Sequence, residues 1–290
     1  MINLSILEVK ELSHSYGGNT PFINDAVNNV SFSVEQGEII GIIGHTGSGK
    51  STLVQHLNGL LKPNSGEILL NGKSIWENPK EIRKIRKEVG LVFQYPEYQL
   101  FEETVYKDIA FGPKNIGFSE EEISACVKET CEIIGIKDDY LDKSPFDLSG
   151  GEKRRVAIAG VLAMKPKVIV FDEPTAGLDP KGREDVINII KNYRKASGAT
   201  IFIISHSMED IAAFADRVLV MNKGKKEMFD TVENVFSNED RLAEIGLSIP
   251  IVTQVFKELR ALNIDVPKNV FTVSQAVEAL KKLKEGNGNA

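Results

Sequence analysis

The motif from which the interpretation of this chain starts is Gly44-His45-Thr46-Gly47-Ser48-Gly49-Lys50-Ser51. It matches the pattern G-x-x-x-x-G-K-[ST], with an apolar strand pattern at residues 38–43 before it and a helical pattern at residues 50–60 after it. Glycines let backbone N–H groups curl around phosphate oxygens, and the helix that follows points its positive N-terminus at the same anion. The alternative is a glycine-rich turn without a ligand, but the full motif in this context favours a phosphate-binding loop.

Two carboxylates downstream supply the second half of a candidate site. Residues 168–173 read Val-Ile-Val-Phe-Asp-Glu, so Asp172 and Glu173 stand at the C-terminal end of a predicted strand, where ligands bind in parallel α/β sheets. We expect Lys50 to reach the β- and γ-phosphates, and Ser51 and Asp172 to hold Mg²⁺. Glu173 is then placed to polarise the attacking water. An acidic pair at a strand end is common and is weak evidence by itself. Downstream of a phosphate loop, it strongly indicates a nucleotide site.

Composition narrows the class of protein. The chain has 290 residues, of which 42% are hydrophobic and 26% charged, which is an ordinary globular composition. Its formal net charge of −6 argues against a non-specific nucleic-acid binder, so we expect no nucleic-acid partner. The longest apolar runs fall short of the ~20 residues of a transmembrane helix, and we expect neither a membrane span nor a signal peptide. Its two cysteines, Cys126 and Cys131, fit a reducing compartment.

Short Ile- and Val-rich runs alternate with longer amphipathic stretches, an order that predicts an α/β fold with a largely parallel sheet covered on both faces. The predicted core strands are residues 38–43, 89–93, 168–171, 200–204 and 218–221, and the predicted helices between them are residues 50–60, 120–134 and 183–195. Three short alternating strands near the N-terminus are separated by Gly and Asn turns and predict an antiparallel subdomain. They are residues 7–12, 30–34 and 67–70.

The same pass along the chain predicts its domains. Helical periodicity dominates residues 101–164, and amphipathic helices without strand patterns follow residue 236. We expect one domain at residues 1–236, with a helical subdomain at about 96–164. A C-terminal helical extension at 237–290 is expected to serve dimerisation or regulation.

A third motif, Leu148-Ser149-Gly150-Gly151-Glu152, opens a predicted helix. Ser149 and Glu152 by themselves form a capping-box pattern. That local explanation leaves out the two adjacent glycines, which are poor helix formers. Glycines at the start of a helix favour a close approach of the backbone to an anion.

Together the motifs resemble those of the nucleotide-binding subunits of ATP-binding-cassette (ABC) transporters. Residues 44–51 resemble the Walker A loop, Gln94 the Q-loop, residues 148–152 the signature motif, residues 168–173 Walker B, Leu178-Asp179 the D-loop and His206 the switch histidine. Tyr16 resembles the aromatic residue that stacks on adenine, and Glu152 stands where glutamine is frequent. The resemblance implies a P-loop NTPase (RecA-like) core with an antiparallel β subdomain, a helical signature subdomain and a small C-terminal extension.

The resemblance also implies that ATP, with Mg²⁺, is hydrolysed between two cassettes that face head to tail. The implied catalytic residues are Lys50, Gln94, Glu173 and His206, and the implied metal ligands are Ser51, Gln94 and Asp172. The residues implied to bind ATP are Tyr16, Gly44, Thr46, Gly47, Ser48, Gly49, Lys50, Ser51 and Thr52, together with Ser149, Gly151 and Asp179 at the shared interface. The other histidines, His14, His45 and His56, are assigned no side-chain role.

Residues 93–112, 154–164 and 172–183 narrow the resemblance to the ATPases of energy-coupling factor (ECF) importers, and Thr20-Pro21-Phe22 resembles one of that family's two ATPase types. This implies a subunit that powers uptake of a micronutrient, either a transition-metal ion such as cobalt or nickel, or a vitamin. The implied partners are a second cassette, a transmembrane coupling subunit and a substrate-binding membrane subunit, at the cytoplasmic face of the cell membrane. The solute, and whether the second cassette is a copy or a paralogue, stay open.

Other classes of protein with a phosphate loop fit less well. An ABC protein that remodels DNA would carry a long coiled-coil insertion between Lys50 and Ser149, for which the spacing leaves no room. A translation factor of this family carries two cassettes per chain, whereas this chain has one set of motifs. A P-loop kinase or GTPase does not account for residues 148–152 or for His206.

Residues 96–103 mix aromatic side chains with three carboxylates, Glu97, Glu102 and Glu103. One interpretation is an ordinary solvated loop. The other is a groove that seats a basic cytoplasmic helix of the transmembrane subunit, with aromatic anchors supplying contact area and the acids supplying orientation.

The extension predicts two amphipathic helices. In the first, Ile251, Val255, Leu259 and Leu262 recur at helical spacing, and the second opens with a capping-box pattern at Thr272. Each apolar stripe must be covered, either by the core of the same protomer or by the same region of a partner cassette.

Overall fold

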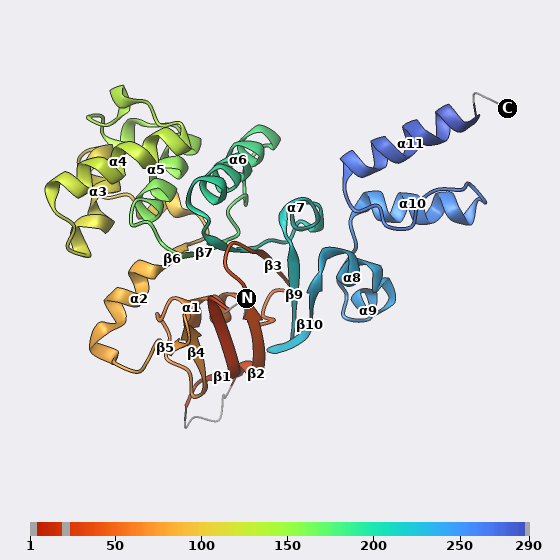
Figure 1. Ribbon diagram of the computed structural model, residues 1–290, viewed down its shortest axis with the longest axis horizontal. Coiled ribbons are helices and arrows are strands. Elements are labelled where there is room, and N and C mark those ends of the chain that lie inside the picture. Colours follow the sequence, from red (N-terminus) through yellow and green to blue (C-terminus); the bar gives the residue numbers. More distant parts are fainter. Residues whose placement is uncertain (1–4, 19–23, 288–290) are drawn as a thin grey trace.

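The computed structural model describes residues 5–18 and 24–287, with side chains as far as residue 284. The segment Thr20-Pro21-Phe22 lies outside the described residues. The described chain forms two sheets, a group of helices on one side of the larger sheet, and a helical extension that projects from the body (Figure 1).

The larger sheet has six strands in the order β10-β9-β3-β8-β7-β6. Neighbouring strands run parallel except β10, which pairs with β9 in the antiparallel sense. The strands are β3 (Ile39–Ile43), β6 (Val89–Val92), β7 (Val168–Asp172), β8 (Thr200–Ile204), β9 (Arg217–Asn222) and β10 (Lys225–Thr231). The predicted α/β fold is therefore confirmed; the hairpin partner β10 was not expected.

Both faces of this sheet are covered, which explains why its strands are continuous apolar runs. In β8, Ile201 and Ile203 pack in the cluster on the helical side. Phe202 and Ile204 pack in the cluster that the sheet shares with the smaller sheet and the first helix.

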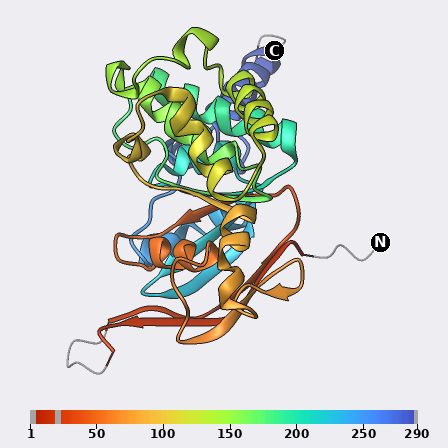
Figure 2. The same cartoon turned by 90° about the vertical axis from the view of Figure 1, so that its left-hand side faces the viewer.

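The smaller sheet is antiparallel, with strand order β2-β1-β4-β5. Its strands are β1 (Leu7–Tyr16), β2 (Asn24–Val34), β4 (Ser65–Leu70) and β5 (Lys73–Ser74). The first two strands are longer than the sequence predicted. Because β1 extends to Tyr16 and β2 begins at Asn24, this sheet reaches the candidate nucleotide site; it lies at the bottom of Figure 2, opposite the helices.

The helices of the main body are α1 (Lys50–Leu57), α2 (Ile82–Glu88), α3 (Val105–Asn115), α4 (Glu120–Ile134), α5 (Gly150–Leu162), α6 (Pro180–Ser197) and α7 (Met208–Phe214). Helices α3, α4 and α5 lie within the range predicted for a helical subdomain. A Cβ atom at Gly112 of α3 would lie 3.0 Å from the Gly160 carbonyl oxygen of α5, so these two helices cross where both lack a side chain.

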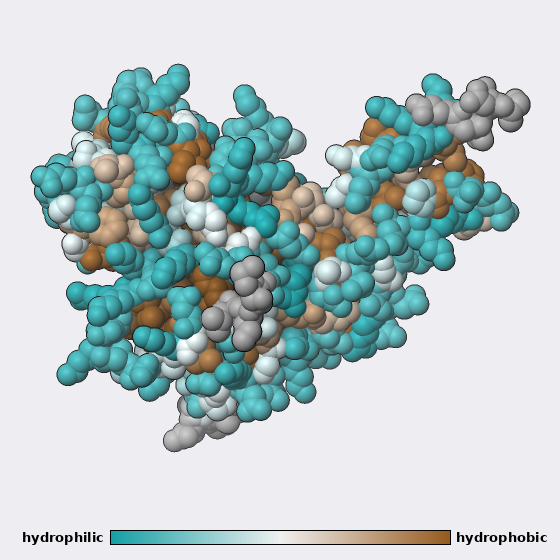
Figure 3. Space-filling view, viewed as in Figure 1, coloured by the Kyte–Doolittle hydropathy of each residue, from teal (hydrophilic) through white to brown (hydrophobic). Residues whose placement is uncertain are grey.

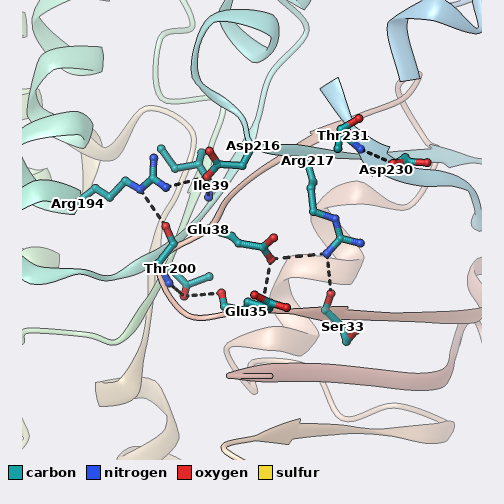
Figure 4. A network of polar contacts seen from close by, with 11 residues as sticks. Ser33, Glu35, Glu38, Ile39, Arg194, Thr200, Asp216, Arg217, Asp230 and Thr231 are labelled. Carbon is teal, nitrogen blue, oxygen red and sulfur yellow. Dashed lines mark hydrogen bonds and ion pairs between the residues drawn. The ribbon is translucent and has the colours of Figure 1, made fainter. Parts of the chain in front are cut away.

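A network of polar contacts ties the amino ends of the parallel strands to the smaller sheet (Figure 4). Arg217, at the start of β9, lies 3.6 Å from the Glu38 carboxylate. Arg194 of α6 donates to Asp216 at 2.8 Å, and the same carboxylate accepts the Ile39 N–H at 2.7 Å. The network lies at the end of the strands opposite the candidate site. It therefore holds α6 and the starts of β3 and β9 together and takes no part in the site itself.

The C-terminal region contains α8 (Val232–Ser237), α9 (Glu239–Glu244), α10 (Ile251–Ala261) and α11 (Val273–Asn287). Phe236 and Leu242 are buried in the core of the main body. Helices α10 and α11 instead pack on each other around Phe256, Val266 and Val270, and they project away from the sheets (Figure 1). Helices α8 and α9 therefore belong to the main body, and the separately packed helical extension begins at α10.

The apolar stripe predicted on α10 is largely exposed in the protomer. Ile251 and Leu262 are 65% and 72% exposed, and Val255 is also exposed. Only Leu259 of that stripe packs against the small cluster, whose centre on this helix is Phe256. Apolar surface is visible along the extension in Figure 3. Among the described residues no helix combines the length and the apolar character needed to cross a membrane.

Candidate functional site

The loop between β3 and α1 forms the first part of the candidate site. Gly44 has φ +150° and Gly49 has φ +98°, a conformation that L side chains rarely adopt. A Cβ atom at Gly49 would lie 2.1 Å from the Ala26 carbonyl oxygen, and one at Gly44 would lie 2.3 Å from the Met221 carbonyl oxygen. Both glycines are therefore required for the loop to pass so close to β2 and β9.

The side chain of Lys50 is folded into this loop. Its Nζ atom donates to the carbonyl oxygens of Gly44 at 2.6 Å and His45 at 2.9 Å. Burial lowers the pKa of Lys50, while the carboxylates of Glu173 and Asp172 act in the opposite direction. The ammonium group is thus held at the loop by carbonyl dipoles, a position from which it can turn to phosphate oxygens.

Asp172 ends β7 and Glu173 follows it, as the sequence predicted. Burial raises the pKa of Glu173 to about 7, and the charge of Asp172 acts in the same direction. Burial also raises the pKa of Asp172, against the Ser51 hydroxyl and Lys50, which lower it. Glu173 has φ +51°, an uncommon conformation for a residue other than glycine, and its N–H donates to the Ile204 carbonyl at 3.1 Å.

His206 follows β8 and faces Glu173. Its Nε2 atom lies 3.2 Å from Glu173 Oε1, without the alignment of a hydrogen bond. Burial lowers the pKa of His206, and the charge of Lys50 acts in the same direction. Within the described residues, Glu173 Oε1 and the buried hydroxyl of Ser48 have no hydrogen-bond partner. Glu173 lines the cleft described below, and a buried carboxylate oxygen without a partner there fits a polar ligand.

These groups line one cleft of about 410 Å³. The predicted site residues that line it are Tyr16, Thr46, Gly47, Gly49, Lys50, Ser51, Thr52, Gln94, Asp172, Glu173 and His206. Asn24, Ala26 and Ile204 line it too. Sequence reasoning missed Asn24 and Ala26 because the strand predicted for that region began only at residue 30, and it gave Ile204 only as the end of a core strand. One ammonium group, four hydroxyls and two carboxylates beside a helix N-terminus are a set of polar groups that suits a nucleoside triphosphate with Mg²⁺.

Five predicted ATP-binding residues do not line this cleft: Gly44 and Ser48, which belong to the phosphate loop itself, and Ser149, Gly151 and Asp179, which lie on other segments. Ser149 is the N-cap of α5, with its hydroxyl 3.4 Å from the Glu152 N–H, and Glu152 returns the contact to the Ser149 N–H at 2.8 Å. The Ser149 hydroxyl also donates to the Glu152 carboxylate at 2.6 Å, and this hydrogen bond, with that from the Ser149 N–H, lowers the pKa of Glu152 to about 2. Gly151 is exposed, and open space surrounds the position of a Cβ atom there. Asp179 caps α6 by accepting the Gly182 N–H at 2.8 Å.

Tyr16 stands at the rim of the cleft, at the end of β1. Its ring is 42% exposed, and its hydroxyl lies 3.3 Å from the Thr52 hydroxyl of α1. An aromatic face held beside the phosphate loop is what the predicted stacking on adenine requires.

Two further contacts near the site were not predicted. The His45 ring, on the phosphate loop, hydrogen-bonds to the Ile245 carbonyl at the end of α9. The Ile251 N–H, at the start of α10, donates to Glu209 of α7 at 3.1 Å. The C-terminal region is therefore bound to the phosphate loop and to α7, the helix that follows His206.

The fold and this cleft define an ATP-binding cassette. A family profile described as ABC transporter matches residues 27–176. Among solved structures, the chain resembles cbiO1 from Clostridium perfringens, described as part of the ABC transporter complex cbiONQ, with 38% identity, TM-score 0.74, and coverage of 87% of this chain and 99% of that one. A dimeric cassette in a post-hydrolysis state bound to ADP and Pi matches with 28% identity, TM-score 0.69, and coverage of 78% and 98%.

Two curated relatives are similar along almost their whole length. An energy-coupling factor transporter ATP-binding protein EcfA2 from Clostridium perfringens is 54% identical over 97% of this chain and 99% of its own. One from Caldanaerobacter subterraneus is 52% identical over 98% and 99%. The chain belongs to the energy-coupling factor transporter ATP-binding proteins, a family of ABC ATPases. It is an ATPase that binds ATP, with Mg²⁺ as the usual partner of that nucleotide.

Proposed function

We propose that this chain hydrolyses ATP to power an ECF-type importer of a micronutrient, either a transition-metal ion such as cobalt or nickel, or a vitamin. The observation that carries the proposal is an incomplete site. One cleft gathers the groups for binding and hydrolysis, whereas Ser149, Gly151 and Asp179 lie outside it on exposed surface. A second cassette facing head to tail would bring those groups to the first cleft. The names of the relatives support the transporter assignment.

The groups of the cleft have distinct tasks in this proposal. The loop N–H groups and Lys50 bind the β- and γ-phosphates. Bound Mg²⁺ neutralises phosphate charge, and Ser51, Asp172 and Gln94 are the residues that would hold it. Glu173, whose pKa is about 7, can accept a proton from the attacking water near neutral pH, and His206 lies beside it to orient that carboxylate.

The signature end of α5 acts from the other cassette. Ser149 and Gly151 present a hydroxyl and a backbone N–H at a helix N-terminus, with open space in front of the glycine. Such a terminus stabilises negative charge. ATP would therefore close the pair of cassettes, and loss of the γ-phosphate would release them.

A groove between α3 and α5 is the proposed docking place of the transmembrane coupling subunit. It has a volume of about 480 Å³, and Phe101 and Phe111 line it in edge-to-face contact at 4.8 Å. Tyr98, in the loop after Gln94, is 84% exposed. Exposed aromatic side chains beside acids suit a basic amphipathic helix, and docking there would place the chain at the cytoplasmic face of the membrane.

The exposed faces of α10 and α11 are the proposed pairing surface of the C-terminal extension. Ile251 and Val255 on α10 and Leu262 at its C-terminal end are exposed together with Val273, Val277 and Leu280 on α11. The protomer buries a different side of both helices around Phe256. Contact with the same region of a partner cassette would cover these residues and keep the two cassettes close when the nucleotide sites are open.

Replacement of the proposed base tests the proposed function. Glu173→Gln keeps the size of the side chain, so ATP should still bind and close the pair, while turnover falls about 10²–10⁴-fold. Light scattering with and without ATP measures closure, and phosphate release measures turnover. Lys50→Ala is the contrasting variant, because it should lose ATP binding itself. Normal turnover by Glu173→Gln would remove Glu173 from the role of base.

Purification of the chain with its membrane complex tests the transporter and addresses the solute. Affinity capture from solubilised membranes should recover a second cassette, a coupling subunit and a substrate-binding subunit. Metal analysis and mass spectrometry of the bound small molecules then separate a metal ion from a vitamin. Recovery of the chain without any membrane protein would contradict the proposal.

A further inference from the structure

Three aromatic side chains form a continuous stack from the interior to the rim of the cleft. The rings of His56 and His14 lie 4.6 Å apart at 67°, and those of His14 and Tyr16 lie 4.7 Å apart at 81°. Both are the edge-to-face arrangement that aromatic pairs prefer. The stack therefore connects α1, which begins at the phosphate loop, with the ring proposed to carry adenine.

His56 is the fixed inner end of the stack. It lies on α1 and is fully buried. Its Nδ1 atom is 2.7 Å from the Thr52 carbonyl oxygen, which can only accept, so Nδ1 carries the proton. Burial lowers the pKa of His56, so the ring is neutral near pH 7. A buried neutral ring with one backbone hydrogen bond has a single orientation against which His14 can pack.

Tyr16 is the exposed outer end. Its hydroxyl lies 3.3 Å from the Thr52 hydroxyl, and its ring contacts His14. A partly exposed side chain that lacked such supports would populate several rotamers, and ordering it on ligand binding would cost entropy. Thr52 and His56 are one turn apart on α1, so this helix supports the Tyr16 ring directly through Thr52 and indirectly through His56, which packs against His14.

One ring nitrogen of each histidine in the stack makes no hydrogen bond. Within the described residues, neither Nδ1 of His14 nor Nε2 of His56 has a hydrogen-bond partner. A buried polar atom without a partner stabilises nothing. What His14 supplies in this place is therefore the shape and the edge of an aromatic ring.

We propose that His14 is a positioning residue for ATP binding, which holds the Tyr16 ring in the orientation that adenine requires. His56 fixes His14 to the helix whose N-terminus holds the phosphates, so the base platform and the phosphate loop keep a set separation. Such pre-organisation raises affinity because the ring is already ordered before the nucleotide arrives. The inference rests on the proposed stacking of adenine on Tyr16.

A double-mutant cycle in the full-length chain tests the proposal. His14→Val removes the ring but suits a strand, and His14→Phe is the matched control that keeps a ring. Dissociation constants are measured by calorimetry for the non-hydrolysable analogue AMP-PNP and for inorganic tripolyphosphate, both with Mg²⁺. His14→Val should raise the Kd of AMP-PNP about threefold, and His14→Phe should leave it within about twofold. The Kd of tripolyphosphate should not change.

The background of Tyr16→Ala separates this proposal from the one on which it rests. Tyr16→Ala should raise the Kd of AMP-PNP about tenfold, and His14→Val should add no further loss in that background. If Tyr16→Ala weakens AMP-PNP and tripolyphosphate equally, adenine stacking fails. If Tyr16→Ala behaves as expected but His14→Val has no effect, or has the same effect with and without Tyr16, the positioning role of His14 is overturned. His14→Thr replaces His14→Val if that variant does not fold.

Discussion

Arg154 and Glu97 form a two-point ion pair inside the molecule. The Nε and Nη2 atoms of Arg154 each donate to a different oxygen of Glu97 at 2.9 Å. The third nitrogen, Nη1, donates to the carbonyl oxygens of Pro174 and Ala176 at 3.3 and 3.0 Å. Arg154 therefore joins the signature helix α5 to the loop after Gln94 and to the segment after Glu173. The sequence predicted Glu97 to be one of the docking acids. Its carboxylate instead pairs with Arg154 of the same chain and is not free to bind a partner.

This geometry predicts unequal costs for two similar substitutions. Glu97→Gln keeps the size of the side chain but leaves the buried guanidinium without a charge partner, which should destabilise the fold by about 3 kcal/mol. Glu103→Gln is the matched control, because Glu103 pairs with Lys107 on the exposed surface and its loss should have no measurable effect. Urea unfolding checks both; equal midpoints for the two variants would contradict a structural role for the ion pair.

The docking groove predicts a loss of assembly without a loss of nucleotide binding. Glu102→Lys with Glu103→Lys and Tyr98→Ala should abolish co-purification with the transmembrane subunit, because the loop beside the groove would lose an exposed aromatic anchor and repel a basic helix. Glu97 is unchanged in this variant, so its ion pair with Arg154 of α5 is preserved. ATP affinity measured on the same preparation is the control. Unchanged assembly would mean that these residues form an ordinary solvated loop.

The extension predicts an association that does not depend on ATP. Val255→Glu with Leu262→Glu should make the nucleotide-free protein monomeric by light scattering, since Val255 on α10 and Leu262 at its C-terminal end are both exposed and a charge there would be buried on pairing. Ala261→Glu places the same charge on the same helix away from this stripe, and should leave association unchanged. With ATP, the double variant in a Glu173→Gln chain should still pair through the nucleotide sites. A nucleotide-free double variant that remains paired would exclude this surface.

The contact between the phosphate loop and the C-terminal region predicts an effect at a distance from the nucleotide. A Cβ atom at Gly246, which has φ +72°, would lie 2.9 Å from His45 Nε2. Gly246→Ala should therefore displace His45, whose carbonyl holds Lys50, and raise the Kd of ATP several-fold in addition to lowering the melting temperature. Gly135→Ala is the matched control: its φ is +77° with open space around it, so it should lower the melting temperature alone. Equal ATP affinities for the two variants would show that the contact does not reach the site.

The sequence by itself determined the phosphate loop, the carboxylates after β7, the histidine after β8 and the five parallel core strands. These depend on local patterns, because a glycine-rich turn between an apolar strand and a helix, or two acids at a strand end, need only a few neighbouring residues. Only the tertiary structure decided which residues far apart in the sequence contact one another around the site. The partner of Glu97 lies 57 positions away along the chain, and the carbonyl that His45 contacts lies 200 positions away. The periodicity of α10 predicted an apolar stripe but could not tell which side the protomer covers, because Phe256 and the exposed Ile251 both belong to apolar rows and only the position of α11 chooses between them.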